Sequence, residues 1–307
     1  MMKKVALFGL IFIFIGLCVD KRETIITYVN NFLSEFHKGD IVEKRNVYYR
    51  DYDFTFVKNT NNFRPENFQD IINIYYTIIN SGLDTYTFKC GRKYETCLQD
   101  IDNLATSQSL LSDINNYVHP FNGFTNIETS YDSMGYITLT IDKTYTESQI
   151  ASVNKAIDDV YNTLVKPELS LEENIRNVHD YIINNTKYDT MRKAGDSPYS
   201  SDTAYGTLYE GYAVCGGYAD TMALFLERMN VKNYKISSEI HVWNAVYLNN
   251  KWLHLDLTWD DPVSLYGDNF LEHNFFLINT EELFKLEKKE HFFNESSYPE
   301  FVLQKNN

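Results

Sequence analysis

The chain has 307 residues, enough for one large domain or two of ordinary size. Hydrophobic residues make up 44% of it, which predicts a sizeable core and excludes wholesale disorder. The net charge of −14 argues against a nucleic-acid partner and against general attraction to anionic membrane surfaces.

The first residues have the pattern of a secretory leader rather than of a folded domain. A lysine pair precedes an uninterrupted apolar run over 5–17, which is short for a membrane span and typical of a signal-peptide core. Residues 15–18 resemble a bacterial lipoprotein cleavage box ending at Cys18, although Leu17 stands where a small residue is preferred. We therefore expect residues 1–19 to be a signal peptide or a membrane or lipid anchor. Lipidation of Cys18 and an uncleaved anchor are the alternatives, and in each case the rest of the chain would lie outside the cytoplasm, secreted or held at the outer face of the membrane.

Residues 23–142 are predicted to form a smaller α+β domain. Its helical patterns cover 25–36, 68–79 and 101–118, its strand-like patterns cover 46–57 and 85–89, and 125–141 is typical of a hairpin. The sequence of this unit contains no catalytic constellation, so its role stays open.

Two cysteines of the first unit bracket a short loop. Cys90 and Cys97 are separated by six residues, a spacing that a disulfide could close in an oxidising compartment. Two unpaired buried thiols are the alternative. Metal binding is disfavoured because no second Cys/His pair stands at ligand spacing, and we expect no metal and no cofactor.

The second unit is predicted over 146–307 and begins with helices. Capping boxes at Thr146 and Ser170 introduce two amphipathic helical patterns. A polar loop over 184–202 follows them, and then a helix over 219–229 with Cys215 at or just before its first turn. Three short strands complete the pattern, and an Asn-Asn pair marks a hairpin turn between the last two; the strands are expected over 234–240, 242–248 and 252–257.

Cys215, His241 and Asp256 are the side-chain types that a thiol nucleophile requires. A helix N-terminus favours the thiolate, because its unpaired N–H groups attract negative charge. Gly216 lets the backbone come close to a substrate oxygen, so that its N–H could stabilise an oxyanion. His241 begins one strand and Asp256 ends a strand one hairpin later, so adjacent antiparallel strands could bring them together. In this arrangement His241 carries the proton and Asp256 orients it.

Three sequence blocks carry a family resemblance. Gly-Tyr-Ala-Val-Cys-Gly-Gly-Tyr-Ala-Asp over 211–220, His-Val-Trp-Asn over 241–244 and Leu-Asp-Leu-Thr-Trp-Asp-Asp-Pro over 255–262 together resemble the transglutaminase-like superfamily, its bacterial members in particular. The resemblance covers about 170–262 and implies a papain-like α+β core, with a nucleophile helix packed on an antiparallel sheet. It also implies attack on amides through a thioester. One departure is that Ser-Ser-Glu precedes His241 where a glycine is expected.

Further side chains near these blocks have two interpretations each. Tyr205 and Tyr209 could assist the oxyanion through a hydroxyl, and Trp243 and Trp259 could flank a substrate groove or belong to the core. His254 shares a strand face with Asp256 and is a rival base, but the block around His241 favours His241.

The sequence therefore predicts an extracytoplasmic cysteine enzyme that acts on peptide or protein amides, as a peptidase, an amidase or an acyltransferase. Cell-wall or surface proteins are the expected class of partner, and the membrane is reached only through the leader. The alternative is a cell-surface binding module on the same fold in which the triad is idle.

Overall fold

The computed structural model describes residues 45–304 apart from 92, 133, 193–194 and 263–270. The predicted leader, Cys18 and the predicted helix over 25–36 lie outside the described residues. Within the described ranges, no helix is both long and apolar enough to cross a membrane.

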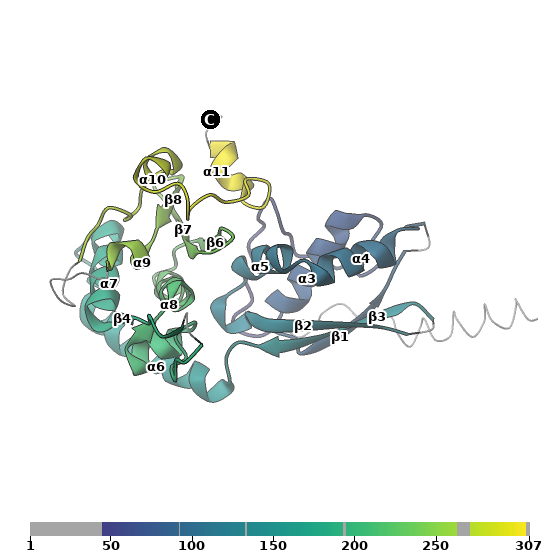
Figure 1. Ribbon diagram of the computed structural model, residues 1–307, viewed down its shortest axis with the longest axis horizontal. Helices are drawn as coiled ribbons and strands as arrows, with labels where there is room; N and C mark the ends of the chain where they lie inside the picture. Colours follow the sequence, from purple (N-terminus) through teal and green to yellow (C-terminus); the bar gives the residue numbers. More distant parts are fainter. Residues whose placement is uncertain (1–44, 92, 133, 193–194, 263–270, 305–307) are drawn as a thin grey trace, which may run out of the picture.

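The first unit is a three-stranded antiparallel sheet with helices over one face (Figure 1). The strand order is β1-β3-β2. In chain order its elements are α3 (Phe68–Asn80), β1 (Thr85–Lys89), α4 (Cys97–Thr106), α5 (Gln108–Asn116), the 3₁₀ turn η1 (Pro120–Asn122), β2 (Phe124–Tyr131) and β3 (Tyr136–Lys143). Cys90 and Cys97 form a disulfide that ties the end of β1 to the start of α4.

Two elements of this unit differ from their predictions. The helix expected over 101–118 is two helices, because the backbone of Ser107 is extended and its hydroxyl accepts the amide of Leu110 to begin α5. The segment 46–57 is not a strand. Its backbone bonds to side chains instead: the Arg50 amide donates to Asn80 Oδ1, and the Asn80 side chain donates to the Arg50 carbonyl. The aromatic alternation there reflects anchoring in the core, since Phe54 is buried.

The second unit places helices against a second antiparallel sheet of order β6-β7-β8. Helix α8 packs on β6 and β7 and on α7, which confirms the expected helix on an antiparallel sheet. Both predicted capping boxes are present, at Thr146 and Ser170. The elements are α6 (Glu147–Leu164), α7 (Leu171–Asn185), β4 (Lys187–Tyr188), the π turn η3 (Gly206–Glu210), β5 (Tyr212–Ala213), α8 (Cys215–Arg228), β6 (Asn233–Ser237), β7 (Val242–Leu248), β8 (Lys251–Leu255), α9 (Leu257–Asp260), α10 (Thr280–Leu286) and α11 (Pro299–Leu303).

The hydrophobic core continues across the two units. The cluster around α3, α4 and α5 includes Tyr234, Trp243 and Tyr298 from the second unit. Arg50 is buried and forms an ion pair with Glu227 on α8, with nitrogen and oxygen 2.6 Å apart. The first unit and the C-terminal segment therefore support the sheet that carries His241.

Candidate active site

Cys215 is the first residue of α8 and is partly exposed. The N-cap residue Val214 has an extended backbone and makes no side-chain cap hydrogen bond. The amides of the first turn are therefore not taken by a capping side chain, and their partial positive charge favours a thiolate or an oxyanion at this position.

Glycine in the first turn of α8 permits close packing against the preceding loop. A Cβ at Gly217 would overlap the carbonyl oxygen of Ser201, and one at Gly216 would lie 3.1 Å from the carbonyl oxygen of Asp202. The same Ser201 carbonyl accepts the Val214 amide at 2.9 Å. The two glycines let this loop fix the start of the helix and so the position of Cys215.

A serine turn sets the position of His241. The Ser238 hydroxyl accepts the amide of His241 at 3.1 Å, and the Ser238 amide donates to the His241 carbonyl at 2.9 Å. The serine sequence that departs from the expected glycine thus builds its own tight turn before β7. In β7, the Asn244 side chain donates to the carbonyl of Ala219 and ties the strand to α8.

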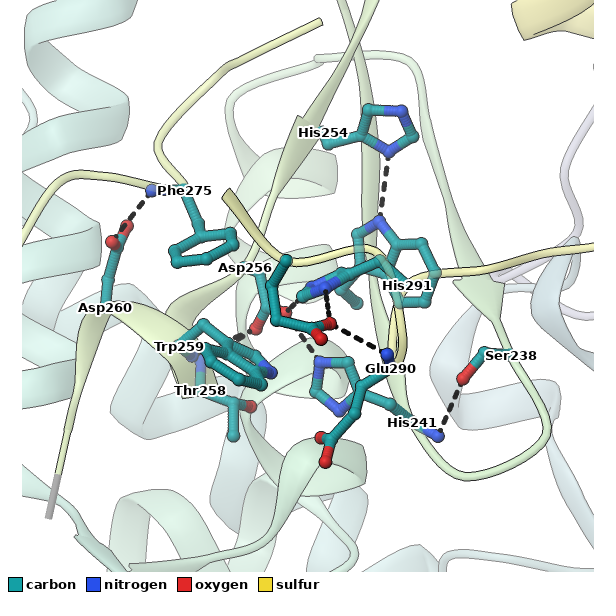
Figure 2. Close-up of polar contacts among 12 residues, drawn as sticks. Ser238, His241, His254, Asp256, Thr258, Trp259, Asp260, Phe275, Glu290 and His291 are labelled. Carbon is teal, nitrogen blue, oxygen red and sulfur yellow. Dashed lines mark hydrogen bonds and ion pairs between the residues drawn. The ribbon is translucent and has the colours of Figure 1, made fainter. Parts of the chain in front are cut away.

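Asp256 divides its two carboxylate oxygens between two tasks. Oδ1 accepts the amides of Thr258 and Trp259 and caps α9. Oδ2 accepts from Nε2 of His241 at 2.5 Å (Figure 2). Because the α9 amides hold Oδ1, Oδ2 is the oxygen that remains to face His241.

The electrostatics of this pair favour a charged imidazole ring. Burial alone would lower the pKa of His241, but the Asp256 carboxylate and a side-chain hydrogen bond with Cys215 raise this pKa to about 10. Burial would raise the pKa of Asp256, yet His241 and a second histidine, His291, hold it well below its usual range. With Nε2 bonded to Asp256, Nδ1 is the ring nitrogen left to face the sulfur.

His291 is the residue that the sequence interpretation missed. Its Nε2 donates to Oδ2 of Asp256 at 2.8 Å, and its Nδ1 lies 3.2 Å from Oε2 of Glu287. The side chain is completely buried. It follows Asp256 by 35 residues and belongs to no recognisable motif, so no sequence signal connected the two.

Tyr188 is a second residue that the structure adds. The strand pair β4–β5 aligns Tyr188 with Ala213, two residues before Cys215. Burial raises the pKa of Tyr188, and the charges of Cys215 and Glu290 raise it further.

The other predicted residues make contacts of their own. The Tyr209 hydroxyl donates to the Ser152 carbonyl on α6 and Tyr205 stacks on the Tyr209 ring, and the oxyanion role of both stays a prediction. Trp243 is a core residue whose indole donates to Nδ1 of His254, which removes His254 as a rival base. Trp259 is half-buried and packs on His291.

A second group of histidines and carboxylates lies between α7 and α9. His179 Nδ1 is 2.9 Å from Asp180 Oδ1, His179 Nε2 is 3.1 Å from Asp260 Oδ2, and His273 Nε2 is 2.7 Å from the same Asp180 oxygen. In this group and in the group around Asp256, the ligand atoms of three residues lie within 4.8 Å of one another. Each of these ring nitrogens is at hydrogen-bonding distance from a carboxylate oxygen, and we assign no metal to either group.

The thiol therefore stands at the first residue of α8 and the histidine directly before β7, and a family comparison covers both. Residues 158–257 match the family model described as "Transglutaminase-like superfamily", a segment that runs from α6 to the start of α9 and includes Cys215, His241 and Asp256. The chain therefore carries a transglutaminase-like domain.

Solved structures and curated proteins add little to this assignment. One similar structure is described as a "TGase", with 14% identity, a TM-score of 0.35 and 46% of each chain covered. Another is a "Putative Cysteine Protease from Cytophaga hutchinsonii", with 14% identity and a TM-score of 0.28, covering 43% of this chain and 61% of that one. The chain thus spans less than two thirds of either relative. No curated protein matches it.

Proposed function

We propose that the protein is a cysteine enzyme that opens peptide or protein amides through a thioester on Cys215. The observation that carries this proposal is a series of hydrogen bonds that joins three side chains, Cys215, His241 and Asp256. Cys215 shares a hydrogen bond with His241, and His241 Nε2 donates to Asp256 at 2.5 Å. The side chains of His241 and Asp256 are almost completely buried, whereas Cys215 is partly exposed. Of the three residues, Cys215 is therefore the one that a substrate can reach from solvent.

The reaction would follow from these positions. The Cys215 thiolate attacks the amide carbon, and the carbonyl oxygen becomes an oxyanion near the first-turn amides of α8, Gly216 included. His241 gives its proton to the departing amine as the carbon–nitrogen bond breaks, which leaves a thioester and a neutral imidazole. Water or a second amine then attacks the thioester carbon and loses a proton to His241, and the thiolate is released. Asp256 holds the ring in one tautomer throughout.

In this proposal the Tyr188 hydroxyl assists the first step as a donor to the oxyanion, a role for which such donors are suited. The pairing of Tyr188 with Ala213, two residues before Cys215, supports this assignment. The acyl acceptor decides between peptidase or amidase and acyltransferase, and both belong to this proposal.

We also propose an extracytoplasmic location, with cell-wall or surface proteins as substrates. The Cys90–Cys97 disulfide supports an oxidising compartment, since such bonds are rare in the cytosol. The leader-like pattern of residues 1–19 supports the same location.

Reactivity of the thiol tests the proposal against an idle binding module. Iodoacetamide at pH 6 should alkylate Cys215 at least about tenfold faster than a free peptide thiol, because the first-turn amides of α8 and the hydrogen bond with His241 favour negative charge on the sulfur. Cys215→Ala should lose both this labelling and amide turnover on a peptide panel. Labelling at the rate of the free peptide, or turnover that survives Cys215→Ala, would contradict the proposal.

A further inference from the structure

The hydrogen-bonded series Cys215–His241–Asp256 does not end at Asp256, because His291 extends it into the core. Asp256 Oδ2 accepts from His241 on one side and from His291 on the other, at 2.5 and 2.8 Å (Figure 2). The His291 side chain is fully buried, and its ring packs against Phe275 and Trp243. The ring therefore cannot turn away from Asp256 without a change in the core.

Glu287 fixes the other side of His291. Its Oε2 lies 3.2 Å from His291 Nδ1 and also accepts the Glu290 amide at 2.7 Å, while Oε1 accepts the Lys289 amide at 2.9 Å. Burial would raise the pKa of Glu287, but these hydrogen bonds lower it, so the carboxylate is ionised and can only accept.

Two carboxylates face the two nitrogens of the His291 ring. Asp256 and Glu287 are both acceptors, and each lies at hydrogen-bonding distance from one ring nitrogen of His291. The buried contacts therefore run from Glu287 through His291, Asp256 and His241 to Cys215. The hydrogen bonds from the two histidines offset the cost of placing the Asp256 charge away from water.

We infer that His291 is a positioning residue for Asp256, supplied by a segment that lies beyond the family-matched residues 158–257. Oδ2 is the oxygen that orients His241, and the α9 amides restrain only Oδ1. Without the donor on His291, Oδ2 would have a single partner, and the carboxylate could rotate about its Cα–Cβ and Cβ–Cγ bonds. His291 holds this oxygen where the imidazole needs it. The inference rests on the proposed function only for its consequence on amide turnover.

Two substitutions of His291 separate positioning from packing. A glutamine amide nitrogen reaches the place of a histidine Nε2, whereas that of asparagine stops near Nδ1. His291→Gln can therefore still donate to Asp256, and His291→Asn can donate only toward Glu287. His119→Gln is the matched control, since His119 is also buried but uses Nδ1 to accept the amide of Phe121, in the first unit.

The first measurement is the rate of Cys215 alkylation by iodoacetamide against pH, which needs no substrate. In His291→Asn the rise in rate should move to higher pH by about one unit, because a poorly oriented Asp256 stabilises the His241 cation less. His291→Gln and His119→Gln should keep the wild-type curve. The same curve for all four proteins, or an equal displacement in both His291 variants, would overturn the inference.

Amide turnover is the second measurement. His291→Asn should lower kcat by about 10- to 100-fold with KM little changed, the loss expected for a charge-assisted hydrogen bond. If His291→Asn does not fold, as judged by circular dichroism, Glu287→Gln takes its place and should show a smaller displacement in the same direction. Absence of turnover in the wild type would contradict the proposed function alone, because the alkylation curves would still decide the role of His291.

Discussion

Two aspartates of this molecule each bridge a pair of histidines, and one of the bridges reaches a thiol. Asp256 joins His241 to His291 through one oxygen, and Asp180 joins His179 to His273 in the same way. The Asp256 bridge is buried at every member and has Cys215 at its outer end. The bridge through Asp180 is partly exposed, and its inner end is the Asp260 carboxylate. Histidine–carboxylate pairing is therefore common to both bridges, and a thiol at one end is the feature that distinguishes the Asp256 bridge.

The largest effect is expected for Asp256→Asn. The amide keeps the shape of the carboxylate and can still cap α9, but it removes the charge that holds the His241 proton. We expect kcat/KM for amide cleavage to fall by about 10⁴-fold, the order of loss seen when the acid of a triad becomes an amide.

The pH profile of Asp256→Asn provides a second measure of the same change. His241 must be protonated to release the amine, and its pKa of about 10 predicts that the rate of acylation falls only above that pH. In the variant this pKa drops, so the alkaline fall should begin at lower pH. An unchanged alkaline limb would show that Asp256 does not control the His241 proton.

The next largest effect is expected on the stability of the protein, for a substitution in the bridge through Asp180. His179→Ala removes a buried ring and leaves the fully buried Asp260 charge without its partner. Breaking a buried pair on one side costs about 3–5 kcal/mol in the free energy of unfolding, which urea denaturation would measure. Cys215 alkylation of the folded variant should match the wild type. A slower alkylation at intact stability would make the His179 bridge part of the catalytic machinery.

Elements that are specified by residues close together in the sequence could be predicted from it. The helix that begins at Cys215, the strand that follows His241 and the hairpin turn at Asn249 and Asn250 were predictable, because local patterns specify each of them. The cap that Asp256 forms on α9 was not predicted. Asn249 and Asn250 both have positive φ at that hairpin, as their type predicts.

His291 and the irregular segment 46–57 were not predictable, for a common reason. Each is held by partners far away in the chain: His291 by Asp256 and Arg50 by Asn80. Alternating aromatic residues indicate a half-buried segment, but they do not say whether a strand or a set of asparagine side chains will bind its backbone.

The smallest effect is expected for Asp180→Asn, which makes the same chemical change as Asp256→Asn in the other bridge. The Asp180 side chain is 34% exposed, so solvent screens its pairs and we expect a loss of only about 0–1 kcal/mol in the free energy of unfolding. Burial would raise the pKa of Asp180, but His179 and His273 lower it below its ordinary value of 3.8. A carboxyl with a lowered pKa contributes stability above that value and loses this contribution as the pH falls through its folded pKa. The unfolding curves of variant and wild type should therefore differ slightly at neutral pH and converge in acid, with alkylation of Cys215 unchanged. If the two matched substitutions instead changed alkylation to the same degree, the position of the nucleophile would not be what separates the two bridges.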